Sequence, residues 1–298
     1  MIAVMMLTWR TLYPIKAVYL YFPRLIQIKK SIRQLNALMN IHSEDEESII
    51  TFKKIPQIKG DVILTQVGFR YPTAIHPTLL NINAHFKMGE LIALTGANGS
   101  GKTTLLKLLL GTYMPQVGTI YIDGMDLRQF DLINYRKTVA YSGQVSELFH
   151  GTIEQNLRLA NPTVTHEQII VATKAAGIYD MIESLDGGFG AHLPSQARFY
   201  LPQSFRFGLC LARAYLKNAS LILLDEPVGN FDKVFEKYFL DALNRLRGKS
   251  TIIMCTHQPS LMQIADKIMV LDRGHIQHFG LTQQVMKKTR QKNNEKTK

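Results

Sequence analysis

The sequence "TGANGSGKTT" (Thr95–Thr104) decides the fold of this chain. It follows the strand-like run Glu90–Leu94 ("ELIAL") and precedes the helix-like run Leu105–Leu110 ("LLKLLL"). A glycine-rich turn between a strand and a helix is typical of a phosphate-binding loop, or P-loop. Its glycines let backbone N–H groups turn toward phosphates, and the partial positive charge at the helix N-terminus favours anions. We therefore expect a nucleotide-binding protein.

The spacing within this stretch assigns roles to single side chains. Gly96 is separated by four residues from Gly101, which Lys102 and Thr103 follow directly. Lys102 is predicted to reach the β- and γ-phosphates, and the Thr103 hydroxyl is predicted to bind Mg²⁺. The predicted nucleotide-binding residues of the loop are Gly96, Ala97, Asn98, Gly99, Ser100, Gly101, Lys102, Thr103 and Thr104.

A second motif lies downstream, where the apolar run Leu221–Leu224 ends in Asp225 and Glu226. Asp225 at the tip of a buried strand can hold Mg²⁺ through water, and Glu226 can polarise the attacking water as general base. An apolar run that ends in two carboxylates can also be a solvated strand end. Its position after a P-loop favours the catalytic interpretation.

Composition sets wider limits on the class of protein. The chain has 298 residues, of which 46% are apolar, so it can form one large domain or two small ones. Cys210 and Cys255 lie far apart, which indicates neither a disulfide framework nor a metal site and is typical of a reducing compartment. The net charge of +12 includes six basic residues and one acid in the tail Lys287–Lys298. That tail either keeps the chain soluble or is attracted to an anionic membrane surface.

The order of predicted elements indicates the fold class. After Gly60, short strand-like runs alternate with helical segments such as Asp232–Leu246. This alternation predicts an α/β domain with a largely parallel, buried sheet. Before Gly60, Arg24–Met39 places apolar residues at helical spacing and predicts an amphipathic helix, and Asn40–Gln57 has the character of a linker.

The N-terminal apolar segment is too interrupted to span a membrane. Arg10, Pro14 and Lys16 divide it, whereas a span needs roughly 20 apolar residues. We expect it to be the inner end of a longer helix.

These motifs together resemble the nucleotide-binding domain of an ABC (ATP-binding cassette) transporter, over about Gly60 to Met286. The resemblance implies a P-loop NTPase (RecA-like) core, an antiparallel β-subdomain and an α-helical subdomain over about Glu154–Lys217. It also implies ATP hydrolysis, with ATP and Mg²⁺ as cofactors.

The resemblance assigns four further residues. Tyr71 in "FRYP" matches the aromatic residue that stacks on adenine, although it can also be a core tyrosine. Gln144 in "VAYSGQVSELFHGTI" matches the glutamine that senses the γ-phosphate and Mg²⁺. His257 in "IIMCTHQ" matches the switch histidine that contacts the γ-phosphate, and Asp232 in "EPVGNFD" matches an aspartate at the dimer interface.

The segment before the linker is most similar to the type I secretion branch of ABC exporters. We predict that residues 1–41 are the cytosolic end of the last transmembrane helix, 42–59 a linker, 60–286 the nucleotide-binding domain and 287–298 a basic disordered tail. The chain would then begin inside a helix and lack nearly all of its membrane domain.

One stretch departs from the family. The Leu-Ser-Gly-Gly-Gln signature, which contacts the γ-phosphate bound by the partner subunit, falls on Leu201, Pro202, Gln203, Ser204 and Phe205. Pro202 offers neither a hydroxyl nor an N–H group. Gln196 also falls where many exporters have glutamate. Either the chain is a decaying fragment, or it is one half of a heterodimer in which a partner's intact signature completes this chain's own site.

We therefore expect an ATP-hydrolysing exporter subunit that powers transport of proteins or peptides. Its expected partners are a second nucleotide-binding domain, with a heterodimer favoured, and membrane-spanning domains at the cytoplasmic face of the inner membrane. The alternative is a regulatory or inactive chain that binds ATP but hydrolyses little without a partner. A DNA-repair ATPase would need a long coiled coil between the motifs, for which the chain has no space, so no nucleic-acid partner is expected.

Overall fold

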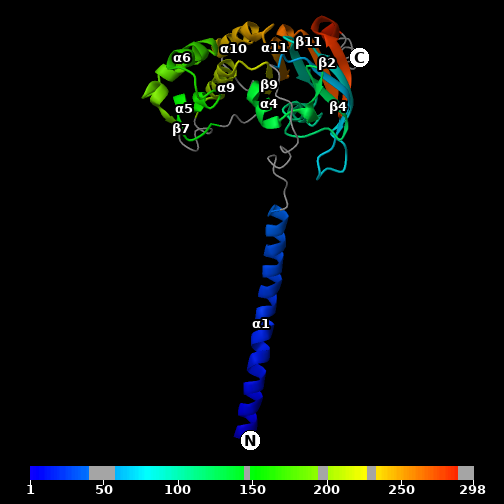
Figure 1. The fold of residues 1–298 in the computed structure, drawn as a ribbon, viewed down its shortest axis with the longest axis vertical. Coiled ribbons are helices and arrows are strands. Elements are labelled where there is room, and N and C mark those ends of the chain that lie inside the picture. The colour runs from blue at the N-terminus through cyan, green and yellow to red at the C-terminus, as the bar shows by residue number, and fades with distance from the viewer. Residues whose placement is uncertain (40–57, 144–147, 194–200, 227–232, 288–298) are drawn as a thin grey trace, which may run out of the picture. The chain divides into compact units, whose positions relative to one another are not determined.

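The computed structural model describes residues 1–39, 58–143, 148–193, 201–226 and 233–287 (Figure 1). The chain divides into two units, Met1–Phe52 and Lys53–Lys298, and each is described by itself. The predicted linker, apart from its last two residues, and most of the predicted basic tail lie outside the described residues.

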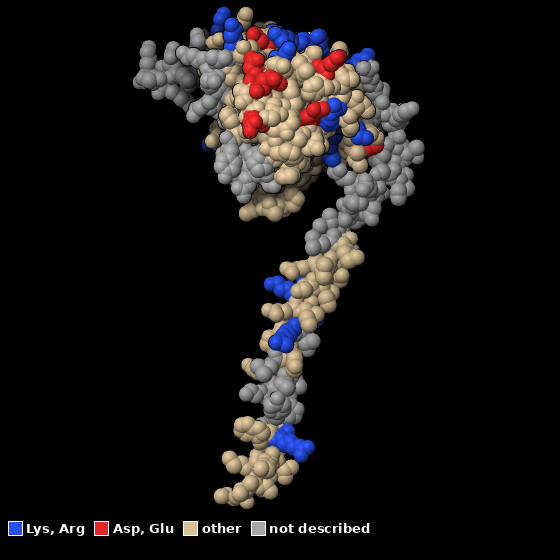
Figure 2. Space-filling view, turned by 90° about the vertical axis from the view of Figure 1, so that its left-hand side faces the viewer, with Lys and Arg blue, Asp and Glu red and all other residues tan. Residues whose placement is uncertain are grey.

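The first unit contains α1 (Ile2–Met39), a single helix of 38 residues. It includes the predicted helix Arg24–Met39 but begins much earlier, and Pro14 lies within it. Its sequence holds basic residues and no acidic ones, and basic side chains are visible at intervals along it (Figure 2). Many of its large apolar side chains are exposed, among them Trp9, Tyr19 and Phe22. Among the described helices, this one included, none combines the length and apolar character needed to cross a membrane.

The second unit is built on a six-stranded sheet in the order β12-β11-β3-β10-β9-β6. Its strands are β3 (Leu91–Thr95), β6 (Val139–Ser142), β9 (Leu221–Asp225), β10 (Thr251–Cys255), β11 (Lys267–Asp272) and β12 (His275–Leu281). All pairs are parallel except β11 with β12. Every residue of β9 and β10 is buried, as continuous apolar strands of a covered parallel sheet require.

A second sheet is antiparallel and has the order β2-β1-β4-β5. Its strands are β1 (Val62–Phe69), β2 (Leu79–Phe86), β4 (Val117–Ile122) and β5 (Met125–Asp126). A short pair, β7 (Gly151–Thr152) and β8 (His192–Leu193), lies among the helices that follow β6. The two larger sheets correspond to the predicted RecA-like core and antiparallel subdomain.

Apart from the last one, the helices of the second unit lie between strands in the order of the chain (Figure 1). They are α3 (Lys102–Leu109), η1 (Leu127–Gln129), α4 (Leu132–Thr138), α5 (Ile153–Arg158), α6 (His166–Ala175), α7 (Tyr179–Glu183), η2 (Gly188–Gly190), α9 (Gln203–Lys217), α10 (Lys233–Leu246) and α11 (Pro259–Ile264), and residues 282–287 are also helical. Capping boxes fix where two of them begin: Thr152 with Gln155 starts α5, and Thr165 with Gln168 starts α6. Helices α5, α6, α7 and α9 correspond to the predicted helical subdomain.

Alternation along β9 divides the core between the two faces of the large sheet. Ile222 and Leu224 pack in a cluster with α6, α9 and α10, whereas Leu221 and Leu223 pack in a cluster with α3 and the antiparallel sheet. The predicted α/β fold class is therefore confirmed.

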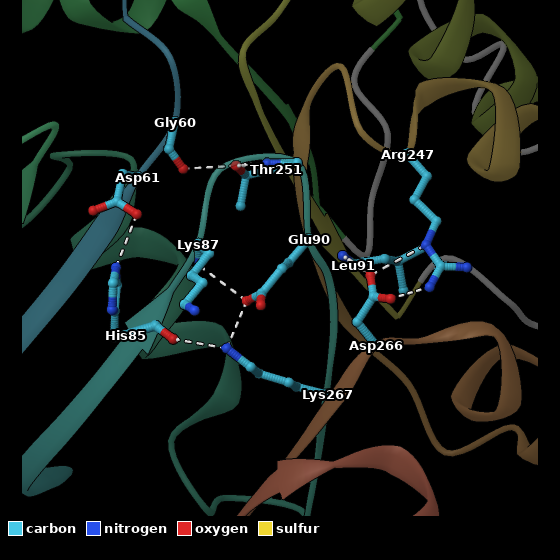
Figure 3. Close-up of polar contacts among 11 residues, drawn as sticks. Gly60, Asp61, His85, Lys87, Glu90, Leu91, Arg247, Thr251, Asp266 and Lys267 are labelled. Carbon is cyan, nitrogen blue, oxygen red and sulfur yellow. Dashed lines mark hydrogen bonds and ion pairs between the residues drawn. The ribbon is translucent and has the colours of Figure 1, made fainter.

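Polar contacts join the segments at the amino ends of the parallel strands (Figure 3). Lys267 Nζ lies 2.8 Å from a carboxylate oxygen of Glu90. Asp266 accepts a hydrogen bond from the N–H of Leu91 and pairs with Arg247. The Thr251 hydroxyl donates to the carbonyl of Gly60 at 2.6 Å. These contacts hold the amino ends of the parallel strands together. The loops that carry the predicted site lie at the opposite, carboxyl ends of the strands.

Candidate nucleotide-binding site

The P-loop connects β3 to α3, and two of its glycines are required by its geometry. Gly96 has φ 146°, and a Cβ there would lie 2.0 Å from the carbonyl oxygen of Leu271. Gly101 has φ 104°, and a Cβ there would lie 2.6 Å from Cδ2 of Leu79. Both backbone conformations are ones that L side chains rarely adopt. The loop can therefore keep this path only with glycine at these positions.

Lys102 begins α3 with its side chain buried, 6% exposed. Its Nζ donates to the carbonyl oxygens of Gly96 at 2.8 Å and Ala97 at 3.1 Å. These two bonds hold the ammonium against the inner backbone of the loop. A buried cation in a ring of backbone groups is suited to binding phosphate.

Ser100 provides a second sign of an anion site. Its side chain is buried, and within the described part of the chain its hydroxyl has no hydrogen-bond partner. An unsatisfied buried hydroxyl costs about 1–3 kcal/mol. A phosphate oxygen at the loop would accept a hydrogen bond from it, so this residue suits the predicted ligand.

Asp225 lies at the carboxyl end of β9 and is 1% exposed. Burial raises the pKa of this carboxyl group, and the neighbouring Glu226 adds to the rise. Side-chain hydrogen bonds with Thr103 and Cys255, and the charge of Lys102, lower the pKa and so favour the carboxylate. Among the described residues, none forms a hydrogen bond with Oδ1 of Asp225.

These features suit the Mg²⁺ that the sequence predicts. Asp225 and Thr103 come together from β9 and α3, and they offer a carboxylate and a hydroxyl oxygen, the ligand types that Mg²⁺ prefers. The described residues contain no cluster of three or more His, Cys, Asp or Glu that could hold a metal. Mg²⁺ is usually held by one or two protein ligands with several waters, so this small donor set is sufficient.

Sequence reasoning did not identify Cys255 as part of this site. Cys255 ends β10 directly beside Asp225 in the parallel register. Burial raises the pKa of its thiol well above the ordinary value, and its hydrogen bond with Asp225 acts in the same direction. The neutral thiol is thus the donor to the carboxylate. The only sequence signal is its position two residues before His257.

Glu226 and His257 follow the ends of β9 and β10. Glu226 has φ 49°, which is uncommon for a residue with a side chain, and its N–H donates to the carbonyl of Cys255 at 3.1 Å. Its Oε1 lies 3.9 Å from Nε2 of His257. Both side chains are partly exposed, so solvent can reach them, as activation of a water molecule requires.

Tyr71 lies beside α3. Its ring meets those of Phe69 and Tyr113 edge to face, with centroids 5.0 and 5.3 Å away. Its hydroxyl lies 3.2 Å from Oγ1 of Thr104. These contacts leave the ring half-buried and hold it close to the P-loop helix. Its role as a platform for adenine stays a prediction.

The divergent signature lies at the start of α9. Pro202 is exposed and is the N-cap residue, with φ −54° and no side-chain hydrogen bond to the helix. Ser204 is half-buried, and Leu201 packs against the core. Phe205 is 2% exposed, so its side chain lies in the core and not on the surface predicted to meet a partner. The side chain of Gln203 lies outside the described residues, as do Gln144, Gln196 and Asp232.

Comparisons with known proteins indicate the family of this chain. The family model described as "ABC transporter" matches residues 79–229. The protein MG015 of Mycoplasma genitalium is 34% identical over 242 residues, which are 81% of this chain and 41% of that protein. The leukotoxin export ATP-binding protein LtxB of Aggregatibacter actinomycetemcomitans is 30% identical over 261 residues, 88% of this chain and 36% of that protein.

A solved structure of a bacterial Atm1-family ABC exporter with ATP bound shares the fold. Its TM-score is 0.76 at 24% identity, and the match covers 88% of this chain and 46% of that chain. This chain therefore spans about two fifths of the length of the curated relatives that it matches.

Proposed function

The chain belongs to the ABC transporter family, and we propose that it binds and hydrolyses ATP to power export across a membrane. The observation that carries the proposal is the meeting of Lys102, Thr103 and Asp225 at the carboxyl edge of the parallel sheet. This group combines a buried cation at a glycine loop with a hydroxyl and a carboxylate that suit Mg²⁺.

Each residue would perform a separate part of the reaction. The P-loop N–H groups and Lys102 would bind and orient the β- and γ-phosphates. Thr103 and Asp225 would hold Mg²⁺, which neutralises phosphate charge when bound, with Gln144 as a further ligand. Glu226 would accept a proton from the attacking water, and His257 would contact the γ-phosphate. Tyr71 would stack on adenine.

The substrate and location are proposed from the relatives. LtxB and the LktB proteins are described as leukotoxin export and translocation ATP-binding proteins. We propose protein or peptide export for this chain, with membrane-spanning domains as partners and a place at the cytoplasmic face of the inner membrane. Residues 1–41 would belong to the membrane domain, and residues 60–286 would form the nucleotide-binding domain.

A second nucleotide-binding domain would complete the site. Pro202 cannot donate a hydrogen bond to phosphate, so two copies of this chain would lack that contact at both sites. A heterodimer whose partner has an intact signature, with Asp232 at the interface, would restore it at the site of this chain's P-loop. The same observation favours one other function, a regulatory subunit that binds ATP and hydrolyses little.

Repair of the signature tests hydrolysis directly. The variant Pro202→Ser/Gln203→Gly/Ser204→Gly restores a hydroxyl and two closely approaching N–H groups and leaves the core residue Phe205 unchanged. Each restored contact to a charged phosphate contributes about 1.5–3 kcal/mol. The equilibrium constant for ATP-driven closure of the dimer should therefore increase roughly 10²-fold or more. Phosphate release from Mg-ATP should rise and should depend on protein concentration. If the wild-type chain and the repaired variant both bind ATP but neither releases phosphate, the result favours the regulatory function over hydrolysis.

A further inference from the structure

A cavity of about 980 Å³ lies at the amino edge of the six-stranded sheet, away from the P-loop. Ser220 and Ser250, which precede β9 and β10, are among the residues that line it. Its sides come from α6, α9 and the end of α10, which lie next to one another in Figure 1. The cavity thus lies where the helical subdomain meets the core, and no part of the proposed nucleotide site lines it.

Three cations surround this cavity: Lys59, Arg245 and Lys249. The residues described as lining it include no Asp or Glu. Carboxylates near this region pair with cations that do not line the cavity. Asp266 pairs with Arg247, and Glu90 pairs with Lys267. None of these three residues forms an ion pair with a described carboxylate, although the Asp123 carboxylate accepts a hydrogen bond from the backbone N–H of Lys59. Three cations around one cavity with no carboxylate in its lining favour an anion there.

The rest of the wall is mainly apolar. Val171 and Ala175 from α6, Ala214 from α9, Leu246 from α10 and Met88 from the turn before β3 face the cavity. An inorganic anion alone would leave this wall in contact with water. A ligand that combines an anionic group with an apolar body would use both parts of the lining.

We infer that this cavity binds an amphipathic phosphate compound. A phosphate group carries up to two negative charges and several acceptor oxygens, which suit one arginine and two lysines. The volume lies within the range of small-ligand sites, about 300–1,000 Å³, and leaves room for an apolar body. The phosphate could belong to a free compound or to a lipid headgroup. This site is separate from the P-loop, so its existence does not depend on the proposed function.

The test uses the purified 298-residue chain and two phosphate probes. One is mant-AMP, a fluorescent nucleoside monophosphate, and the other is phosphatidylglycerol vesicles, with phosphatidylcholine vesicles as the neutral comparison. The variant Arg245→Ala/Lys249→Ala removes two cations from the cavity. The control Lys137→Ala/Lys237→Ala removes two exposed lysines outside it. Ala175→Trp fills the apolar side without changing charge, and Lys102→Ala removes the P-loop cation.

We expect Arg245→Ala/Lys249→Ala to weaken binding of at least one probe about tenfold or more relative to the control. For mant-AMP, Ala175→Trp should weaken binding as well, and the binding that remains in Lys102→Ala measures the share that does not depend on the P-loop. A loss with mant-AMP identifies a free phosphate compound, and a loss confined to phosphatidylglycerol vesicles identifies a lipid headgroup. Equal affinity of the cavity variant and the control for both probes overturns the inference. The inference is also overturned if only Lys102→Ala loses mant-AMP binding and the cavity variant binds vesicles as the control does.

Discussion

Oε1 of Glu226 lies 3.9 Å from Nε2 of His257, beyond the ends of two neighbouring parallel strands. The pair is partly exposed, next to the buried Asp225. In the proposed mechanism, Glu226 accepts a proton from the attacking water molecule and His257 contacts the γ-phosphate.

Glu226→Gln should separate binding from turnover. The amide keeps the shape of the side chain but cannot accept the proton, so ATP should bind with unchanged affinity while hydrolysis falls by about 10²-fold or more. The measurement is phosphate release in the background of the repaired signature, where two copies of the chain can form complete sites. Equal turnover with Glu and Gln at this position would remove the residue from the reaction.

Cys255 should influence Mg²⁺ binding through Asp225. The thiol hydrogen bond lowers the pKa of the carboxyl group, so Cys255→Val should make the carboxylate less available to the metal. The Mg²⁺ concentration for half-maximal ATP binding should rise about threefold to tenfold, because a thiol is a weak donor and its loss matches one ordinary hydrogen bond of about 0.5–1.5 kcal/mol. Cys255→Ser keeps a donor and should remain close to wild type. If valine and serine behave alike, the hydrogen bond has no role in metal binding.

Phe205 should matter for stability, unlike its neighbour in the signature. Phe205→Ala empties a core position and should reduce the free energy of unfolding by about 3–5 kcal/mol. Ser204→Ala, at a half-buried position, should change it by less than about 1 kcal/mol. Urea unfolding followed by circular dichroism measures both. A small effect of Phe205→Ala would contradict the placement of this ring in the core.

Lys217 should give the unfolding free energy a specific pH dependence. Burial lowers the pKa of its ammonium to about 8, and Nζ donates to the carbonyl oxygens of Arg136 and Val139. Between this value and the ordinary 10.5, the unfolded chain binds more protons than the folded one. The free energy of unfolding should therefore gain a positive contribution as pH rises from about 8 to 10.5, and the gain should end above that range.

The difference between wild type and Lys217→Met isolates this contribution from other groups that titrate in the same range. The wild-type curve should rise relative to the variant across the interval. Parallel curves would show that the lysine keeps its ordinary pKa in the fold.

Local sequence patterns predicted the strand and the loop that build the site, because burial of a strand and backbone conformation at glycine depend on neighbouring residues. The run Leu221–Leu224 is apolar at every position, since both faces of β9 are covered, and the glycines of the P-loop are required by the path of the backbone. The predictions for β9 and the surrounding α/β fold were confirmed for this reason.

Features that depend on register and distant packing were not predicted. The contact between Cys255 and Asp225 exists because two strands far apart in sequence are aligned residue by residue. The burial of Phe205 depends on how α9 packs against the rest of the helical subdomain, which five signature letters do not encode. The cavity around Arg245 combines segments from Ile58 to Ser250, so no single stretch of sequence indicates it.

The affinity of the full chain for Mg-ATP, measured by equilibrium dialysis, tests the central claim most directly. Lys102→Ala should weaken binding by about tenfold or more, because it removes a charge-assisted contact to phosphate. Lys137→Ala removes an exposed lysine elsewhere and should leave the affinity unchanged. Equal affinity of wild type and both variants would contradict a nucleotide site built on this P-loop.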